Sequence, residues 1–474
     1  MIKTRIAPSP TGAIHIGLAR TALYNFFYSR NKKGKFLLRI EDTDRERSTE
    51  ASLNSIIEGF KWLGIEWDEG PFFQSQRFGI YKRFADKLIE ENKAYRCFCS
   101  TDRLRNEREQ ASKEGRAWKY DRLCLNLTDD EIERKLKAGD PYVIRFFIPN
   151  GESVYNDLIH GEIRKKHSDI EDFVIMRSDE SFTYNFSVVV DDALMGITHV
   201  IRGVEHINNT FKQILLYKAL GFNPPLFAHL PLILGPDKKK LSKRHGASSI
   251  DEYRQDGIIS KALVNYLTLL GWSPGDNREI MDLADIIALF DVKRVKKSNA
   301  VFDKDKLLWM NSMYIKEMDI EALSDEVLSF IKHQGINGML SVIDKDRDYF
   351  YRVLELIRDR ATTLVDLIET ARIYLFEDYD IEKKAMKYIK TGIEHLKLIK
   401  QRYEALEVWD KSHLEEELRA LSEERGEKAG LFIHPVRAAL TGRKVGPPLF
   451  DIIEVLGKIR TIKRLDRVIN MYII

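Results

Sequence analysis

Cysteine and proline are scarce in this chain, and long apolar runs are absent. Its 474 residues include three cysteines and 13 prolines. Three cysteines are too few for a disulfide framework at this length, so we expect a reducing environment. No apolar stretch approaches the roughly 20 residues that a membrane helix needs, and the N-terminus lacks the charged-then-apolar pattern of a secretion signal. The sequence therefore predicts a cytoplasmic protein with no membrane partner.

A strong net charge is also absent. The chain has 76 lysines and arginines against 73 aspartates and glutamates, which gives a net charge of +3. Any contact with nucleic acid must therefore come from local basic patches rather than from a field over the whole protein. Because 474 residues exceed what one hydrophobic core usually serves, we expect several domains.

A possible phosphate-binding turn opens the chain. Residues Ile2–Ala7 are typical of a strand, Pro8–Gly12 of a turn, and the segment after His15 of a helix. Backbone N–H groups and the helix dipole at such a helix start face an anion. Gly17 removes a side chain where a flat ligand can lie against the backbone, and His15 offers a ring nitrogen that can donate to phosphate. Alone, this pattern indicates ordinary packing more often than a site.

A basic loop far downstream changes that interpretation. Residues Lys238–Gly246 read KKKLSKRHG, in which Lys240 and Lys243 flank Ser242. Mobile ammonium groups stabilise the charge that develops on a leaving pyrophosphate. A lysine cluster alone is more often a solvated loop. Both elements in this order, however, resemble the two signature motifs of class I aminoacyl-tRNA synthetases, His-Ile-Gly-His and Lys-Met-Ser-Lys-Ser.

The resemblance narrows to the glutamyl-tRNA synthetases of bacterial type. The matching stretches are RIAPSPTG (5–12), RIEDTD (39–44), VVVDDALMGITHVIRGVEH (188–206), KLSKR (240–244) and HPVRAALTG (434–442). Leu18 replaces the last histidine of the class-wide motif, so we expect no role for a second histidine there. The resemblance implies an α/β fold: a Rossmann-like parallel-sheet catalytic domain with an inserted α+β acceptor-binding domain, then all-α anticodon-binding domains. The implied boundaries are 1–95 with 182–240 (catalytic), 96–181 (inserted), 241–319 (stem-contact) and 320–474 (anticodon-binding).

A pocket for glutamate needs an acid for the ammonium group and fixed cations for the two carboxylates. Glu41 follows the predicted strand Lys35–Ile40 and suits the ammonium. Arg5 suits a carboxylate, because its fork matches that geometry bidentately, and Ser9 adds a hydroxyl donor. The resemblance implies a glutamate pocket formed by Arg5, Ala7, Ser9, Glu41, Tyr184 and Arg202, with Arg202 on the γ-carboxylate. It implies an ATP site formed by Ala7, His15, Gly17, Glu205 and Lys243, and catalytic roles for His15, Lys240 and Lys243.

Several apolar runs predict the remaining elements of the catalytic fold. We expect Ser187–Val190 (SVVV) to be a buried strand of a parallel sheet. Val200–Ile201 indicates another short strand, and Phe227–Leu234 the last core strand before the basic loop. Asn209–Leu220 is typical of a helix that ends at Gly221. Beyond residue 320 the pattern is amphipathic and helical throughout.

All three cysteines fall in one short region, at positions 97, 99 and 124. Zinc takes four ligands in structural sites, so Cys97, Cys99 and Cys124 leave one position open. Relatives often carry a histidine where Asn126 stands, and close relatives have a tyrosine at the position of Tyr120. We favour Tyr120 over Asn126, because a phenolate neutralises charge and an amide does not. The sequence thus predicts a structural zinc ion, and free cysteines without a metal remain the alternative.

Three groups of basic residues are candidates for contacts with tRNA. Arg164–His167, in the β-rich inserted segment, can track phosphate, although lysines that protect a sheet edge explain the pattern equally well. The resemblance assigns Arg360 and Arg437 to positions that read the last bases of the anticodon. An arginine at position 360 resembles enzymes that charge only the glutamate tRNA.

The sequence predicts a cytoplasmic, monomeric glutamate–tRNA ligase whose partners are tRNA, L-glutamate and ATP with Mg²⁺. The α-carboxylate of glutamate attacks the α-phosphate of ATP and expels pyrophosphate, and the 3′-terminal ribose hydroxyl of the tRNA then attacks the adenylate. The alternatives are a ligase that modifies an anticodon nucleoside, a small-molecule nucleotidyltransferase and a tRNA-binding module without activity. The first two have no use for the C-terminal helices, and the third is expected to lose His15 or Lys243.

Overall fold

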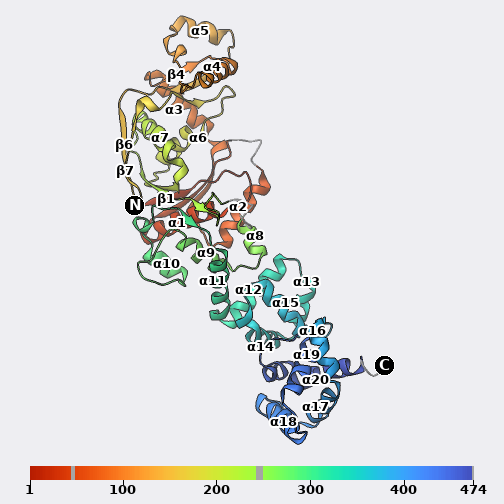
Figure 1. The fold of residues 1–474 in the computed structure, drawn as a ribbon. Helices are drawn as coiled ribbons and strands as arrows, with labels where there is room; N and C mark the ends of the chain where they lie inside the picture. Colours follow the sequence, from red (N-terminus) through yellow and green to blue (C-terminus); the bar gives the residue numbers. More distant parts are fainter. Residues whose placement is uncertain (44–48, 242–248, 472–474) are drawn as a thin grey trace. The chain divides into compact units, whose positions relative to one another are not determined.

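The computed structural model describes residues 1–43, 49–241 and 249–471. The chain divides into two compact units, Met1–Glu252 with Leu263–Asp303, and Tyr253–Ala262 with Lys304–Ile474. The first unit combines sheets with helices (Figure 1). Every regular element described in the second unit is helical.

Two sets of mainly parallel strands form the centre of the first unit. One set has the order β1-β2-β3, made of β1 (Lys3–Ile6), β2 (Lys35–Ile40) and β3 (Glu69–Phe73). The other has the order β7-β6-β10-β9, made of β7 (Gly161–Lys166), β6 (Glu152–Asp157), β10 (Leu226–Leu230) and β9 (His199–Gly203), with only β7 antiparallel. The backbone N–H of Thr198 donates to the carbonyl oxygen of Lys3 at 2.9 Å, which places β9 beside β1.

Helices cover these strands, and the strand side chains are buried accordingly. Phe36, Leu37 and Leu38 of β2 are all fully buried, as expected of a parallel sheet with both faces covered. α1 (Ile16–Asn31) packs against β1, β2 and β9 (Figure 1). The remaining helices of this unit are α2 (Glu50–Trp62), α3 (Phe78–Glu90), α4 (Thr101–Lys113), α5 (Asp129–Lys137), α6 (Tyr184–Leu194), α7 (Ile207–Leu220) and α10 (Leu283–Leu289). α8 (Ile250–Gln255) and α9 (Ser260–Leu269) cross the boundaries between the units.

The prediction of a strand over Ser187–Val190 is wrong, because this segment lies inside α6. Every residue from Phe186 to Asp192 is buried, so the helix shows no polar face that would reveal its period. Short apolar runs do not distinguish a buried strand from a buried helix. The predicted strand Phe227–Leu234 is interrupted at Pro231, which separates β10 from β11 (Ile233–Leu234). The other predicted strands, in β2 and β9, and the helix ending at Gly221 are confirmed.

The segment between α3 and α6 contributes to two sheets. β4 (Ala94–Cys97), β5 (Val143–Phe146) and β8 (Phe173–Met176) form a separate antiparallel sheet in the order β4-β5-β8. The β6–β7 hairpin instead extends the parallel sheet, with Asp157 of β6 opposite Phe227 of β10. A short parallel pair, β11 with β12 (Ala300–Val301), completes the strands described in this unit.

The second unit is a helical array around one large core. Its helices are α11 (Lys304–Glu317), α12 (Ile320–His333), α13 (Asn337–Ile343), α14 (Arg347–Ile357), α15 (Leu364–Leu375), α16 (Lys383–Thr391), α17 (Ile393–Ala405), α18 (Lys411–Glu424), α19 (Gly430–Thr441) and α20 (Leu449–Asn470). Apolar residues from each of these helices are buried together. Gly457, with φ 74°, interrupts the helical backbone of α20. The helical pattern predicted beyond residue 320 is therefore confirmed.

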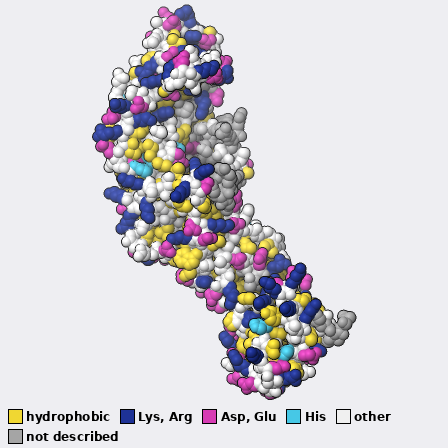
Figure 2. All heavy atoms as spheres, viewed as in Figure 1, with side chains coloured by type: hydrophobic (Ala, Val, Ile, Leu, Met, Phe, Trp, Pro, Cys, Tyr) yellow, Lys and Arg dark blue, Asp and Glu magenta, His cyan; other side chains and the backbone are white. Residues whose placement is uncertain are grey.

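The surface agrees with the balanced composition. On the face that Figure 2 shows, lysine and arginine side chains are interspersed with aspartate and glutamate side chains. Basic and acidic side chains are thus mixed on this face, in keeping with the small net charge of +3. Of the helices described, none is both long and apolar enough to cross a bilayer.

Candidate active site

A cavity of about 940 Å³ lies where β1, β2 and β9 end and α1 begins. This is the edge at which open α/β sheets bind ligands. The cavity brings together ten residues that the sequence indicated: Arg5, Ala7, Ser9, His15, Gly17, Glu41, Tyr184, Arg202, Glu205 and Lys240. Lys243 lies outside the described residues.

His15 is the N-cap of α1, and this fixes what its ring offers to the cavity. Its Nδ1 atom accepts a hydrogen bond from the backbone N–H of Leu18 at 3.2 Å. Burial against the cavity wall and the nearby Lys240 ammonium lower the pKa of His15, so the ring is neutral at pH 7. A neutral ring that accepts at Nδ1 carries its proton on Nε2. His15 therefore presents a hydrogen-bond donor beside the free N–H groups of a helix start, which suits a phosphate oxygen.

Two glycines allow close packing around the cavity. A Cβ atom on Gly17 would lie 3.0 Å from Nδ1 of His15, so any side chain there would displace the histidine ring. A Cβ atom on Gly203 would lie 2.3 Å from Oε2 of Glu205. The carboxylate of Glu205 thus lies directly over the backbone at the end of β9.

Arg202 is a buried cation held entirely by neutral groups. Its side chain donates to Tyr184 Oη at 3.2 Å, to His229 Nε2 at 3.3 Å, to Thr210 Oγ1 at 2.7 Å and to Gln213 Oε1 at 2.8 Å. The residue is 5% exposed. No carboxylate of the residues that the structure describes forms an ion pair with it. Because a buried charge is costly without a partner, the charge of this guanidinium favours an anionic ligand, and Nη1, which donates once to Tyr184, has a second N–H for a carboxylate oxygen.

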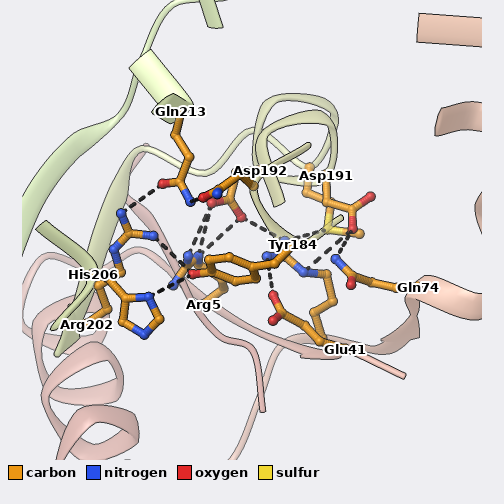
Figure 3. A network of polar contacts seen from close by, with 12 residues as sticks. Arg5, Glu41, Gln74, Tyr184, Asp191, Asp192, Arg202, His206 and Gln213 are labelled. Carbon is orange, nitrogen blue, oxygen red and sulfur yellow. Dashed lines mark hydrogen bonds and ion pairs between the residues drawn. The ribbon is translucent and has the colours of Figure 1, made fainter. Parts of the chain in front are cut away.

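Arg5 belongs to a chain of alternating charges (Figure 3). Its guanidinium donates to Asp192 at 3.2 Å, and Arg39 donates to the same carboxylate at 2.7 Å. Arg39 also contacts Glu41 at 3.4 Å. In the view of Figure 3, Arg202 and Glu41 lie to either side of Tyr184. Burial raises the pKa of Glu41 despite the nearby arginines, so a cation beside this carboxylate would favour its ionised form.

The sequence motifs do not reveal the residues that hold this row of charges in place. Asp191, the neighbour of Asp192 on α6, accepts from Gln74 at 2.9 Å, Arg77 at 2.7 Å and Tyr81 at 2.8 Å. The available signal was Arg39 itself, a charged residue inside the apolar strand KFLLRI. Carboxylates are effective partners for a buried arginine, and the adjacent Asp191 and Asp192 pair with Arg39.

Comparison with known proteins identifies the family. Residues 1–309 match the family described as tRNA synthetases class I (E and Q), catalytic domain, where E and Q denote glutamate and glutamine. The chain belongs to this class I tRNA synthetase family. Residues 316–469 of this synthetase also match a family described as an anticodon binding domain. The family resemblance and the fold class that the sequence predicts are thereby confirmed.

Named relatives align with this synthetase over nearly its full length. A protein of Thermodesulfovibrio yellowstonii named glutamate–tRNA ligase is 48% identical, over 99% of this chain and 100% of that protein. Glutamate–tRNA ligase 2 of Thermoanaerobacter pseudethanolicus is 46% identical, over 99% of this chain and 98% of that protein. A crystal structure of a glutamate tRNA ligase from Elizabethkingia meningosepticum, in complex with its amino acid, superposes with a TM-score of 0.88 at 31% identity and covers 99% of both chains.

The three cysteines of this synthetase lie together. The sulfur atoms of Cys97, Cys99 and Cys124 all lie within 4.8 Å of one another, and those of Cys99 and Cys124 are 3.5 Å apart. The hydroxyl of Tyr120 lies 3.2 Å from the Cys97 sulfur and 3.6 Å from the Cys99 sulfur. Asn126 is exposed. Three sulfurs and one oxygen at this spacing fit a tetrahedral metal site.

Two arginines surround this cysteine cluster. Arg103 donates to the Cys99 sulfur at 2.8 Å, and the Arg145 guanidinium lies 4.1 Å from the centre of the Tyr120 ring. A hydrogen bond from Cys124 is the main cause that lowers the pKa of Cys97 to about 4. The same hydrogen bond raises the pKa of Cys124, and burial raises the pKa of Tyr120. Cys97 is thus the preferred thiolate, and a metal would have to displace the protons of Cys124 and Tyr120.

Arg360 and Arg437 lie in the helical unit, on the short turn after α14 and on α19 respectively. Arg437 donates to the carbonyl oxygen of Pro447. Burial lowers the pKa of Arg437, and the positive charge of Arg360 lowers it further. The fold thus brings together two like charges that are 77 positions apart in the sequence, and no carboxylate in the described part of this unit forms an ion pair with either one.

Proposed function

We propose that this chain is a glutamate–tRNA ligase that forms glutamyl-adenylate from L-glutamate and ATP and transfers glutamate to tRNA. The observation that carries the proposal is Arg202, a buried guanidinium held only by neutral acceptors inside the same cavity as the α1 N-terminus. A carboxylate site and a phosphate site in one cavity are what acid activation by ATP requires.

The amino acid binds between Arg202 and Glu41. Its γ-carboxylate pairs with Arg202, its ammonium group lies against Glu41, and the Ser9 hydroxyl donates to a carboxylate oxygen. Arg5 contributes positive charge with the N–H groups that Asp192 leaves free. Glutamine would place an amide donor against a guanidinium that needs an acceptor, and the site therefore selects against it.

ATP enters as its magnesium complex, with its phosphates at the α1 N-terminus. His15 donates from Nε2 to a phosphate oxygen, and the Lys240 ammonium stabilises the charge that develops on the leaving pyrophosphate. Ala7 and Gly17 leave room for the nucleotide against the backbone, and Glu205 contacts it from the end of β9. Lys243 has the same role as Lys240 in this proposal.

A structural zinc ion would be held by Cys97, Cys99, Cys124 and Tyr120. Three thiolates and a phenolate carry four negative charges, so the bound site has a net charge of −2 that Arg103 and Arg145 balance. The ion would stabilise the inserted segment and take no part in the chemistry at the cavity.

Recognition of tRNA follows the domain order that the sequence predicts. In this proposal residues 96–181 contact the acceptor end, residues 241–319 the stem, and residues 320–474 the anticodon through Arg360 and Arg437. The helical unit favours this function over the nucleoside-modifying and small-molecule alternatives, which have no use for it. A monomeric state in the cytosol stays a prediction of the sequence.

ATP–pyrophosphate exchange tests the proposal. The assay is run with glutamate and with glutamine, each with and without total tRNA. We expect exchange with glutamate alone among the amino acids, and only when tRNA is present. Exchange that needs no tRNA would indicate the nucleoside-modifying relatives, and no exchange from folded protein would refute the enzymatic assignment.

A further inference from the structure

We infer that Asp157 and His229 are positioning residues that hold Arg202 in place without neutralising it, and that they thereby determine selectivity for a carboxylate substrate. This inference rests on the proposed binding of the glutamate γ-carboxylate by Arg202. The three residues lie on adjacent parallel strands, Asp157 at the end of β6, His229 on β10 and Arg202 on β9. Their relative exposures are 2%, 0% and 5%, so the row is buried.

Asp157 is held in its ionised form by four donors. Its Oδ1 atom accepts from the backbone N–H groups of Ile159 and His160, both at 2.9 Å, and of His229 at 3.4 Å. Its Oδ2 atom lies 2.7 Å from Nδ1 of His229. Although burial opposes ionisation, these hydrogen bonds lower the pKa of Asp157. An ionised carboxylate only accepts, so Nδ1 of His229 must carry a proton.

The proton on Nδ1 of His229 determines the state of Nε2 on the other side of the ring. Burial and the nearby Arg202 lower the pKa of His229, so the ring is neutral and Nε2 carries a lone pair. Nε2 accepts from Nε of Arg202 at 3.3 Å and lies 3.0 Å from the Thr210 hydroxyl. A protonated Nε2 would instead point a hydrogen at the guanidinium. The tautomer set by Asp157 is therefore the one that can hold Arg202.

The His229 ring lies between the Asp157 carboxylate and the Arg202 guanidinium, so the carboxylate orients the guanidinium without touching it. A carboxylate in direct contact with Arg202 would compete with the substrate, as Asp192 does at Arg5. With a neutral imidazole between Asp157 and Arg202, the guanidinium is oriented yet keeps its charge for the ligand. The pairing of β6 with β10 brings Asp157 beside His229. The contact between these two residues therefore depends on the sheet and not on local sequence.

Steady-state aminoacylation with glutamate varied, and separately with ATP varied, tests the inference. Asp157→Asn keeps an acceptor for the backbone N–H groups but donates to Nδ1, which moves the ring proton to Nε2. We expect the KM for glutamate to rise about 10- to 100-fold and the KM for ATP to stay unchanged. ¹⁵N NMR of histidine-labelled protein should show the changed tautomer, with the His229 signals assigned by their loss in His229→Asn.

Two substitutions of His229 separate its two bonds. His229→Asn places an amide at the position of Nδ1, so it keeps the contact with Asp157 and loses the acceptor for Arg202. His229→Gln places an oxygen near the position of Nε2 and restores that acceptor. We expect a raised KM for glutamate in His229→Asn and a partial recovery in His229→Gln. This pair decides the question if Asp157→Asn does not fold.

Asp172→Asn serves as a control for general destabilisation, and Arg202→Lys tests the carboxylate site itself. Asp172 is a second buried aspartate, outside the cavity, that accepts from Tyr95 at 2.8 Å and from the Ile148 N–H at 2.9 Å. Asp172→Asn should lower thermal stability without a selective change in the KM for glutamate. If Arg202→Lys raises that KM while Asp157→Asn and His229→Asn do not, the inference is overturned and the proposed site stands. If Arg202→Lys leaves it unchanged, the proposed carboxylate site fails as well.

Discussion

Gly17 lies against the ring of His15: a Cβ atom on the glycine would lie 3.0 Å from Nδ1, close enough to push the ring aside by a few tenths of an ångström. We therefore expect Gly17→Ala to displace the ring and to lower the rate of ATP–pyrophosphate exchange. Alanine favours a helix by about 1 kcal/mol over glycine, so thermal stability should not fall. Gly79→Ala is the matched control, since Gly79 is also helical and a Cβ atom there meets nothing within 4 Å. Equal exchange rates in the two variants would contradict this view.

His15 caps α1 and, in the proposed function, donates to a phosphate oxygen, and two substitutions separate these roles. Asparagine is a good N-cap, so His15→Asn keeps the cap of α1 but loses the donor on Nε2. We expect exchange to fall about 10²- to 10³-fold, the effect of removing one donor to developing charge, with an unchanged melting temperature. His15→Ala should in addition cost about 1 kcal/mol of stability. Full activity in His15→Asn would show that the ring only caps the helix.

We expect Glu41 to make glutamate binding depend on pH. Burial raises the pKa of this carboxyl group, and in the proposed site the substrate ammonium pairs with its ionised form. As pH falls through the raised pKa, protonation competes with the substrate and affinity decreases. As pH rises above it, affinity levels off. Isothermal titration with glutamate in mildly acidic to neutral buffers should show this trend, and Glu41→Gln should bind weakly with the trend removed. A wild-type affinity that is flat across this range would refute the role.

Measuring the zinc content of variants would identify the fourth ligand of a zinc ion at the cysteine cluster. We expect one zinc ion per purified chain and its loss in Cys124→Ser. Tyr120→Phe removes the hydroxyl that lies 3.2 Å from the Cys97 sulfur and should weaken zinc retention against a chelator. Asn126→Ala should retain zinc as the wild type does. If Asn126→Ala loses zinc to the chelator and Tyr120→Phe retains it, Asn126 is the ligand instead. Protein that contains no zinc after expression with the metal would refute the site.

Arg360 is expected to discriminate between tRNAs. Removing an arginine that reads a base costs about 1–3 kcal/mol and relaxes specificity at that position. In Arg360→Gln, kcat/KM for the glutamate tRNA should therefore fall relative to that for the glutamine tRNA. Arg347→Gln serves as the control, because Arg347 is a surface residue of the same unit, paired with Asp325 at 3.0 Å. An unchanged ratio would assign discrimination to other residues.

Sequence reasoning predicted those parts of the site that depend on local order. His15, Gly17 and Glu41 stand directly at the ends of predicted elements, so their place at the sheet edge follows from the chain itself. The same reasoning misassigned Ser187–Val190, because a helix buried on all sides has no polar face to show its period. The roles of the cavity residues stay predictions until the variants are measured.

The partners of the arginines were beyond the reach of sequence patterns. Asp192 meets Arg5 across 187 positions, and His229 meets Arg202 across two strands whose adjacency depends on the whole sheet. A sequence shows which residues can carry charge but not which of them share a buried space. The sequence alone therefore assigns Arg5 to a substrate carboxylate, whereas in the structure its guanidinium is already paired with Asp192.

The burial of the charged chain from Arg5 to Glu41 has a consequence for ionic strength. Salt screens buried charges much less than exposed ones, so added salt should change the affinity for glutamate only slightly. Contacts between surface lysines or arginines and tRNA phosphates release counterions and weaken steeply with salt. Rising salt should therefore dissociate tRNA long before it loosens the amino acid. We therefore expect the burial of Arg5, Arg39 and Asp192 to make the choice of amino acid less dependent on ionic strength than the binding of tRNA is.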